Sequence, residues 1–146
     1  MQVNHDFDIN IHRIKSYAKG EIQVVLPFSA PISPTAMRNE DSDRKSLQVE
    51  KLNHSAVVMP GKLIMNWPVD TVDDLTREYV QELVELKPEL VLIGTGEKLI
   101  WPSRALLAPL TNANIGYEIM GSAAACRTYN ILAHEGRDVT AALMMI

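Results

Sequence analysis

The stretch ELVLIG, residues 89–94, decides the fold class of this 146-residue chain. Its apolar side chains follow one another without the alternation of a half-exposed strand, and a glycine ends the run. A short continuous apolar run bounded by glycine is typical of a strand that is covered on both faces. Such strands occur in parallel sheets with helices above and below, so the stretch predicts an α/β fold.

Helical and strand patterns alternate around this central strand. Apolar residues recur at helical spacing in residues 68–89, where Thr71 or Asp73 can cap a helix and Pro88 ends it. Two further helices are expected over 103–114 and 122–136, and two strands over 115–121 and 137–146. Pro109 is expected to kink the second helix or to end it early. This order implies a largely parallel sheet with right-handed crossovers.

The N-terminal part carries β patterns. Residues 9–26 predict a hairpin that turns near Lys19–Gly20, and strand patterns resume in residues 47–52 and 55–60. We therefore expect a three-layer α/β sandwich around a mixed, mostly parallel sheet, with an N-terminal antiparallel hairpin, in a single domain over residues 1–146. Residues 27–46 contain three prolines and a run of mixed charges, and they show neither strand nor helix periodicity. This composition predicts a long mobile loop.

Composition narrows the function classes. The formal net charge is −4, so the broad basic surface of a nucleic-acid-binding protein is not expected. No apolar run approaches the ~20 residues that span a bilayer, and the N-terminus lacks the pattern of a signal peptide. A single cysteine excludes an intramolecular disulfide. We expect a cytoplasmic protein that is not an integral membrane protein.

Two chain segments are expected to meet at the carboxyl edge of the sheet. Thr95 and Gly96 end the central strand, and Ser122 ends the next strand and opens a helix. The glycine loop matches neither GxGxxG, because Leu99 stands where the third glycine belongs, nor the P-loop motif. We expect Gly94 or Gly96 to hold a backbone conformation that other residues avoid. The candidate ligand-binding residues at this edge are Thr95, Gly96, Ser122, Cys126, Arg127 and Asn130.

The sequence allows three roles for Cys126. A thiol near a helix N-terminus and beside Arg127 can be a nucleophile, and it can also line a ligand cleft. The run Ala123–Ala125 favours the third role, in which the thiol is a small buried side chain of a helix that packs closely on the sheet. We predict the structural role, on the sheet-facing or cleft-facing side of the helix. Arg127 and Asn130 either bracket the cleft or bind neighbouring backbone carbonyls.

The histidines offer no metal site, because none pairs with another ligand at metal-binding spacing. No metal, cofactor or catalytic residue is therefore expected. Two segments, KLIMNWP (62–68) and KLIWP (98–102), both place Trp-Pro between an extended stretch and a helix. Proline suits a helix start and holds the residue before it extended, so shared geometry explains the likeness.

Three stretches carry a resemblance to a known family: VVMPGKLIMNWPVDTVDDL (57–75), LVLIGTGEKLIWP (90–102) and GYEIMGSAAACRTYNILAHEGRDVTAAL (116–143). With AACRTYN (124–130) as the most specific part, the chain resembles bacterial members of a small α/β family of unknown biochemical function. That family includes a mitochondrial respiratory complex I assembly factor. The resemblance implies a three-layer fold, no established catalytic residue, and an insertion at residues 27–46.

Two functions from different classes remain open. The resemblance and the incomplete catalytic constellation favour a non-enzymatic binding or assembly protein with protein partners, for a respiratory or membrane complex. The alternative is a small-molecule or anion-binding domain, or an enzyme, with its cleft at the Gly94–Gly96 loop and the Ser122–Arg127 helix start.

Overall fold

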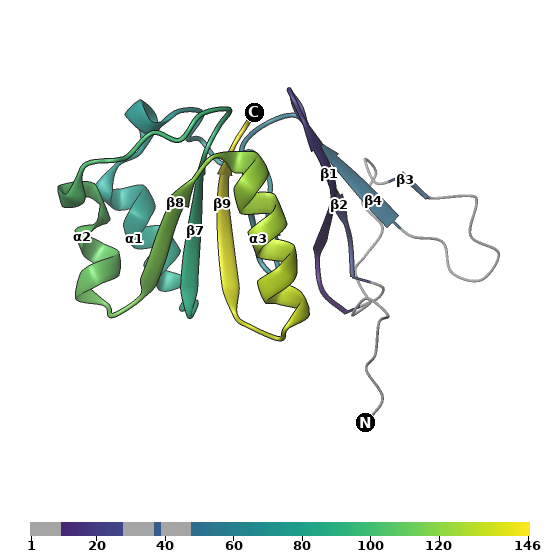
Figure 1. Cartoon of the computed structure of the whole chain (residues 1–146). Helices are drawn as coiled ribbons and strands as arrows, with labels where there is room; N and C mark the ends of the chain where they lie inside the picture. Colours follow the sequence, from purple (N-terminus) through teal and green to yellow (C-terminus); the bar gives the residue numbers. More distant parts are fainter. Residues whose placement is uncertain (1–9, 28–36, 39–47) are drawn as a thin grey trace.

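The computed structural model describes residues 10–27, 37–38 and 48–146, and Figure 1 shows their arrangement. The strands are β1 (Arg13–Ala18), β2 (Glu21–Val25), β3 (Met37–Arg38), β4 (Gln48–Leu52), β5 (Ala56–Val58), β6 (Leu63–Ile64), β7 (Leu90–Thr95), β8 (Gly116–Met120) and β9 (Val139–Met144). The helices are the 3-10 turn η1 (Val72–Asp74), α1 (Arg77–Glu85), α2 (Arg104–Asn112) and α3 (Ser122–His134).

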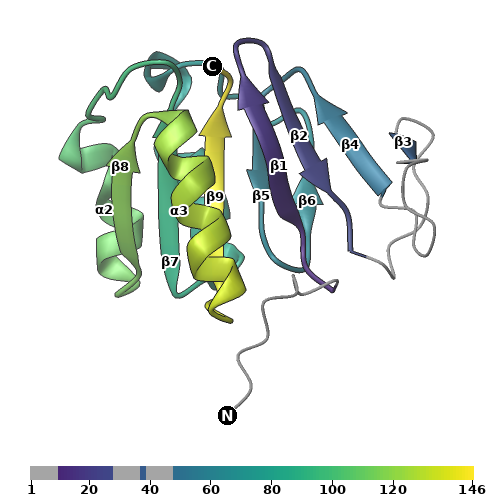
Figure 2. The same ribbon diagram turned by 45° about the vertical axis from the view of Figure 1, so that its right-hand side comes forward.

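A mixed sheet lies at the centre of the molecule, with the strand order β6-β5-β9-β7-β8. The central strand β7 pairs in parallel with β8 on one side and with β9 on the other. Strand β5 pairs antiparallel with both β9 and β6, so β6 runs in the same direction as β9. The carboxyl ends of β6, β7, β8 and β9 therefore share one edge of the sheet, which we call the carboxyl edge (Figure 2).

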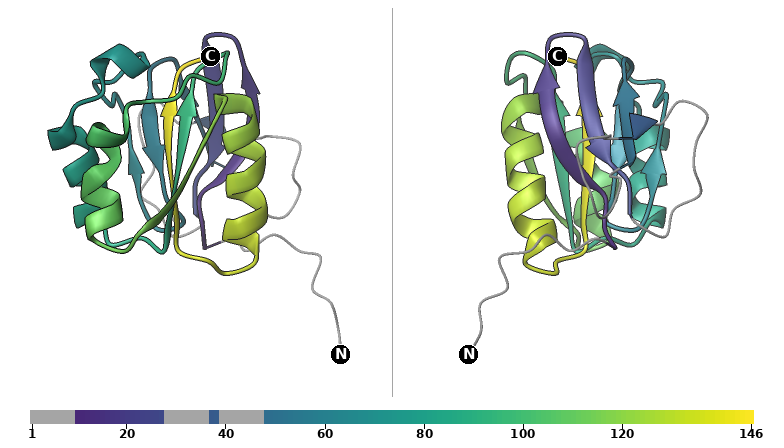
Figure 3. Two further views of the ribbon diagram at one scale, coloured as in Figure 1. Left: turned by 60° about the vertical axis from the view of Figure 1, so that its left-hand side comes forward. Right: turned by 90° about the vertical axis from the view of Figure 1, so that its right-hand side faces the viewer.

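Three layers result, and the predicted α/β fold class is confirmed. Helices α1 and α2 cover one face of the mixed sheet, whereas α3 and the N-terminal strands cover the other (Figures 1 and 3). The N-terminal hairpin also forms as predicted, with Gly20 at its turn in the left-handed region at a φ of 79°.

The hairpin belongs to a second sheet, which the sequence did not predict. Its order is β1-β2-β4-β3, and every pair in it is antiparallel (Figure 2). The apolar residues Ile14, Ile22 and Leu52 on its inner face pack against α3 and β9. Because this sheet buries one face rather than one edge, it stacks on the central sheet and does not extend it.

Two apolar clusters occupy the two faces of the central sheet. Strand β9 is buried at every position, and its side chains alternate between the clusters. Leu143 belongs to the cluster under α3 and the N-terminal sheet, and Met144 belongs to the cluster under α1 and α2. Burial on both faces is what the continuous apolar pattern of a central strand predicts.

The helix boundaries differ in part from the sequence prediction. Neither Thr71 nor Asp73 caps α1, because the Asp74 carboxylate accepts the Thr71 backbone N–H at 3.1 Å and closes the separate turn η1. Helix α1 begins later, with Thr76 as its cap, whose Oγ1 accepts the Tyr79 N–H at 3.2 Å. Helix α2 contains Pro109 and continues to Asn112, so the proline does not end the helix.

The predicted loop over residues 27–46 lies almost entirely outside the described residues. Met37–Arg38 within it form β3, which pairs with Gln48–Val49 of β4. The expectation of an inserted mobile loop therefore stays a prediction.

Candidate functional site

The two loops that the sequence places at the carboxyl edge lie side by side. The Ser122 backbone N–H donates to the Gly96 carbonyl at 2.8 Å, and the Gly96 N–H donates to the Ser122 hydroxyl at 2.8 Å. These reciprocal hydrogen bonds join the end of β7 to the start of α3. The predicted meeting of the two segments is confirmed.

Gly94 and Gly96 both have steric reasons to be glycine. A Cβ on Gly94 would lie 2.8 Å from the Ser122 Oγ and 2.9 Å from the Ser122 Cα, so α3 approaches β7 too closely for any side chain. Gly96 has a φ of 93°, which L residues with a side chain rarely adopt. The expected special backbone conformation is therefore found at Gly96.

The Ser122 hydroxyl is buried and serves the fold. It donates to the Met144 carbonyl at 2.5 Å and accepts the Gly96 N–H, so one side chain ties β7, β9 and α3 together. A hydroxyl has one proton to donate, and here the end of β9 receives it. In this arrangement Ser122 has no proton left for an anion at the helix start.

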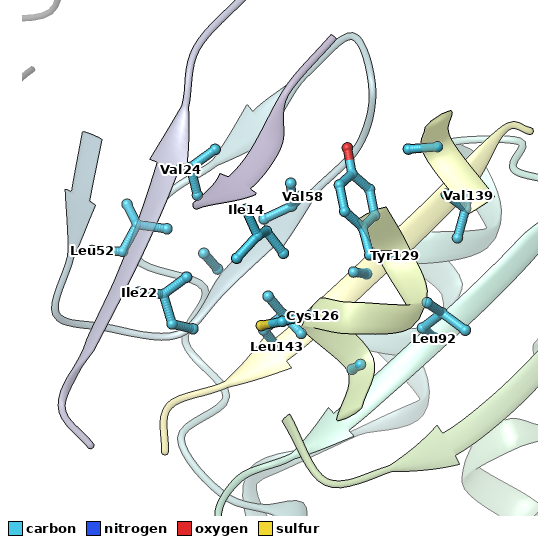
Figure 4. Packing of buried hydrophobic residues seen from close by; sticks show 14 residues of the cluster. Ile14, Ile22, Val24, Leu52, Val58, Leu92, Cys126, Tyr129, Val139 and Leu143 are labelled. Atoms are coloured by element: carbon cyan, nitrogen blue, oxygen red, sulfur yellow. The ribbon is translucent and has the colours of Figure 1, made fainter. Parts of the chain in front are cut away.

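Cys126 is buried in the core, as predicted. It has no exposed surface and belongs to the cluster that also contains Ile22 and Leu143 (Figure 4). Burial raises the pKa of the Cys126 thiol to about 12, and the nearby Arg127 charge offsets only part of that effect. A thiol with this pKa is protonated at neutral pH, which favours the structural role over that of a nucleophile.

Arg127 and Asn130 face the N-terminal sheet instead of bracketing a cleft. The Asn130 side chain accepts the Ile14 N–H at 2.9 Å and donates to the Ile14 carbonyl at 2.8 Å. The exposed Arg127 donates to the Tyr17 hydroxyl at 3.0 Å, with its guanidinium 5.8 Å from the centre of that ring. Two roles were expected for these residues, and Asn130 has the second one, because its side chain binds the backbone of Ile14.

Thr95 builds the loop that follows β7. Its hydroxyl donates to the Lys98 carbonyl at 2.5 Å and accepts the Ile100 N–H at 3.0 Å. Thr95 itself is buried, and so is Pro102 at the far end of the loop. The hydrogen bonds of the buried Thr95 side chain therefore hold the backbone between Thr95 and Pro102 in one conformation.

This loop presents apolar side chains to solvent, a feature that the sequence reasoning missed. Leu99 is 52% exposed, Ile100 is 50% exposed and Trp101 is 67% exposed. We call these three residues the apolar loop. Met65, 44% exposed, follows β6 and so lies at the same carboxyl edge, whereas Ile131, 60% exposed, lies on α3. Most of the large exposed apolar side chains in the described residues thus gather at one edge.

The two Trp-Pro segments carried no sequence signal that would have identified this surface. Trp67 is buried in the cluster under α1 and α2, whereas Trp101, in the matching position before α2, is exposed. The same local sequence therefore has opposite burial. Only the tertiary contacts distinguish the anchoring tryptophan from the exposed one.

Neither a metal cluster nor a membrane-crossing helix is found in the part of the chain that the structure describes. No group of three or more His, Cys, Asp or Glu side chains there could hold a metal ion. The helices among the described residues are too short or too polar to cross a bilayer.

Two solved structures of bacterial proteins have a similar fold. A crystal structure of a protein from Bordetella parapertussis has a TM-score of 0.71 and 28% identity, and the match covers 93% of this chain and 97% of that one. An NMR structure of a Xanthomonas campestris protein has a TM-score of 0.69 and 30% identity, over 99% of this chain and 92% of the other.

Two relatives have names that bear on function. The "13 kDa major membrane protein" of Francisella tularensis is 26% identical over 109 residues, which cover 74% of this chain and 89% of that protein. The rat "NADH dehydrogenase (ubiquinone) 1 alpha subcomplex assembly factor 3" is 35% identical over 83 residues, or 56% of this chain. The matched region spans 45% of the assembly factor, so the chain resembles less than half of it.

A family described as "Protein of unknown function (DUF498/DUF598)" matches residues 40–144. The match covers β4 to β9 and all of the helices in the described residues, together with the apolar loop and the Ser122–Asn130 part of α3. The chain belongs to this family of unknown function, whose relatives include a respiratory complex I assembly factor.

Proposed function

We propose that this chain is a non-enzymatic binding protein that assists the assembly of a protein complex, and that the apolar loop contacts its partner. The observation that carries the proposal is the exposure of Leu99, Ile100 and Trp101 on a backbone fixed by Thr95. Large apolar side chains exposed together are typical of interaction sites. The named assembly factors among the relatives support a protein partner.

The energetics fit a contact surface. Covering the exposed parts of these three side chains contributes roughly 4 kcal/mol before the cost of association. Tryptophan is enriched among the residues that dominate binding energies. Because Thr95 already holds the loop, little conformational entropy is lost on binding.

The alternative, an anion or small-molecule site at the Gly94–Gly96 loop and the Ser122–Arg127 helix start, has weaker support. Ser122 and Asn130 use their polar atoms within the chain, and Cys126 is buried. The cytoplasmic location expected from the sequence is part of the proposal. A relative named as a membrane protein makes a membrane-bound complex a reasonable partner for a peripheral subunit.

The proposal is tested by affinity capture of the tagged full chain from its own cells, with quantitative mass spectrometry. Trp101→Ser removes the most exposed side chain of the apolar loop, and Ile131→Ser is the matched control on α3, in a different layer of the molecule. We expect the same partner with the wild type and Ile131→Ser, and a loss of about 30-fold with Trp101→Ser.

Thermal melts of both variants show whether folding is intact. Since Trp101 is mostly exposed, its replacement leaves the melting temperature nearly unchanged. Equal capture by all three proteins would contradict the proposed function.

A further inference from the structure

An acidic segment lies next to the apolar loop. Helices α1 and α2 pack against each other, and both begin at the carboxyl edge (Figures 1 and 3). The segment that leads into α1 contains Asp70, Asp73 and Asp74, all exposed. The apolar loop leads into α2. The acidic segment and the apolar loop thus occupy neighbouring positions before two adjacent helices.

The charges at this edge are not balanced. Residues 65–78 carry four carboxylates against the single basic side chain of Arg77, whereas residues 95–104 carry one carboxylate against two basic side chains. Neither Asp70 nor Asp73 takes part in an ion pair within the residues that the structure describes. Asp74 accepts backbone N–H groups in η1 and is committed to the fold.

We propose that the partner presents an amphipathic segment with basic flanks, an inference that rests on the proposed function. Its apolar face covers the apolar loop, and its Lys or Arg side chains lie against Asp70 and Asp73. Unpaired surface carboxylates beside an apolar anchor favour partners of opposite charge and reject acidic ones. The occupant is therefore a basic amphipathic protein segment.

Two other occupants fit the surface less well. A second copy of the chain would bring the same negative surplus against itself, which opposes association. An anionic lipid surface is repelled by the same carboxylates, and one short apolar loop lacks the second signal that stable membrane attachment requires.

Trp101 itself provides the binding signal. The chain has two tryptophans, and Trp67 is buried while Trp101 is 67% exposed, so quenching by iodide reports on Trp101. The probes are tryptophan-free peptides of about 18 residues, long enough to form a helix. One has a leucine face and a Lys/Arg face, the second has the same leucine face with Glu, and the third is the basic peptide in scrambled order.

We expect the basic amphipathic peptide to protect Trp101 and to bind at least about 10-fold tighter than the acidic or scrambled peptide at low salt. The double variant D70N/D73N should bind the basic peptide about 3- to 10-fold more weakly and with less dependence on salt. The matched control E82Q/E85Q removes the same charge from the exposed far end of α1 and should bind as the wild type does.

Equal affinity for the basic and acidic peptides, no protection by any peptide, or an unchanged affinity of D70N/D73N would overturn this inference. So would co-sedimentation with phosphatidylglycerol vesicles, or dimerisation in the ultracentrifuge that Trp101→Ser abolishes. The proposed function fails separately, since it predicts the loss of cellular capture in Trp101→Ser whatever charge the peptides carry.

Discussion

Replacing Gly94 by alanine tests the close packing of α3 on β7. The new Cβ would lie 2.8 Å from the Ser122 Oγ and 2.9 Å from the Ser122 Cα, closer than real Cβ contacts allow. The hydroxyl can rotate away only by giving up its hydrogen bonds to Gly96 and Met144, and the Cα can move only with the start of α3.

The expected cost combines two terms. Overpacking in a close-packed core costs about 1–3 kcal/mol, and leaving buried hydrogen-bonding groups unpaired costs about 1–3 kcal/mol. We expect Gly94→Ala to lower the free energy of unfolding by roughly 3 kcal/mol. For a chain of this size that corresponds to a fall of roughly 6–12 °C in melting temperature.

The assay is thermal and urea unfolding followed by circular dichroism, with Gly61→Ala as the matched control. Nothing lies within 4 Å of a Cβ built on Gly61, so that variant should melt within about 2 °C of the wild type. A Gly94→Ala protein that melts together with the control would refute the claimed approach of α3 to β7.

Four further predictions concern the residues around α3 and the N-terminus. In denaturant titrations, Cys126→Ala should lower the free energy of unfolding by about 1 kcal/mol or less and Cys126→Leu by roughly 1–3 kcal/mol, because the thiol fills a small buried space. Rapid labelling of the native protein by a thiol reagent at neutral pH would contradict this prediction. Because the folded pKa of this thiol, about 12, lies above its unfolded value, stability should fall between roughly pH 9 and pH 12, as the unfolded chain alone ionises. Asn130→Ala should lower the free energy of unfolding by roughly 2 kcal/mol, because it removes two hydrogen bonds to Ile14, whereas replacing the exposed Arg127 by alanine should lower it by about 0.5 kcal/mol or less. Equal losses in the two variants would argue against a stabilising role of the Asn130–Ile14 hydrogen bonds. Burial lowers the pKa of His12, so stability should decline below about pH 6.5, where the unfolded chain takes up a proton that the folded chain does not, and His12→Gln should flatten that decline in urea titrations.

The sequence was sufficient for features that depend on local pattern. The apolar run of β7, the turn at Gly20 and the glycine that ends α3 follow from periodicity and backbone preference, and each is found. The same holds for the meeting of Gly96 and Ser122, because carboxyl ends of neighbouring parallel strands share an edge.

The second sheet could not be predicted from local pattern. Its existence depends on the pairing of β2 with β4, across residues 27–46, and on which face of the pair is covered. Strand patterns give the alternation of side chains but not the partner strand. The hairpin was therefore predicted without the sheet to which it belongs.

The candidate site residues show the same limit. Arg127 and Asn130 were placed near the loops by helical spacing, but their contacts with Tyr17 and Ile14 come from the packing of a distant strand. Trp67 and Trp101 have matching local sequences and opposite burial. Exposure is decided by what covers a residue, which no local motif encodes.

Site-specific photo-cross-linking tests the central claim most directly. A benzophenone side chain placed at Leu99 in the full chain lies within the apolar loop, and the same group at Ile131 lies on the exposed side of α3. Irradiation of intact cells should give a discrete cross-linked protein from position 99 and none from position 131. Absence of a product at position 99, or the same product at both positions, would contradict the assignment of the apolar loop as the partner-binding surface.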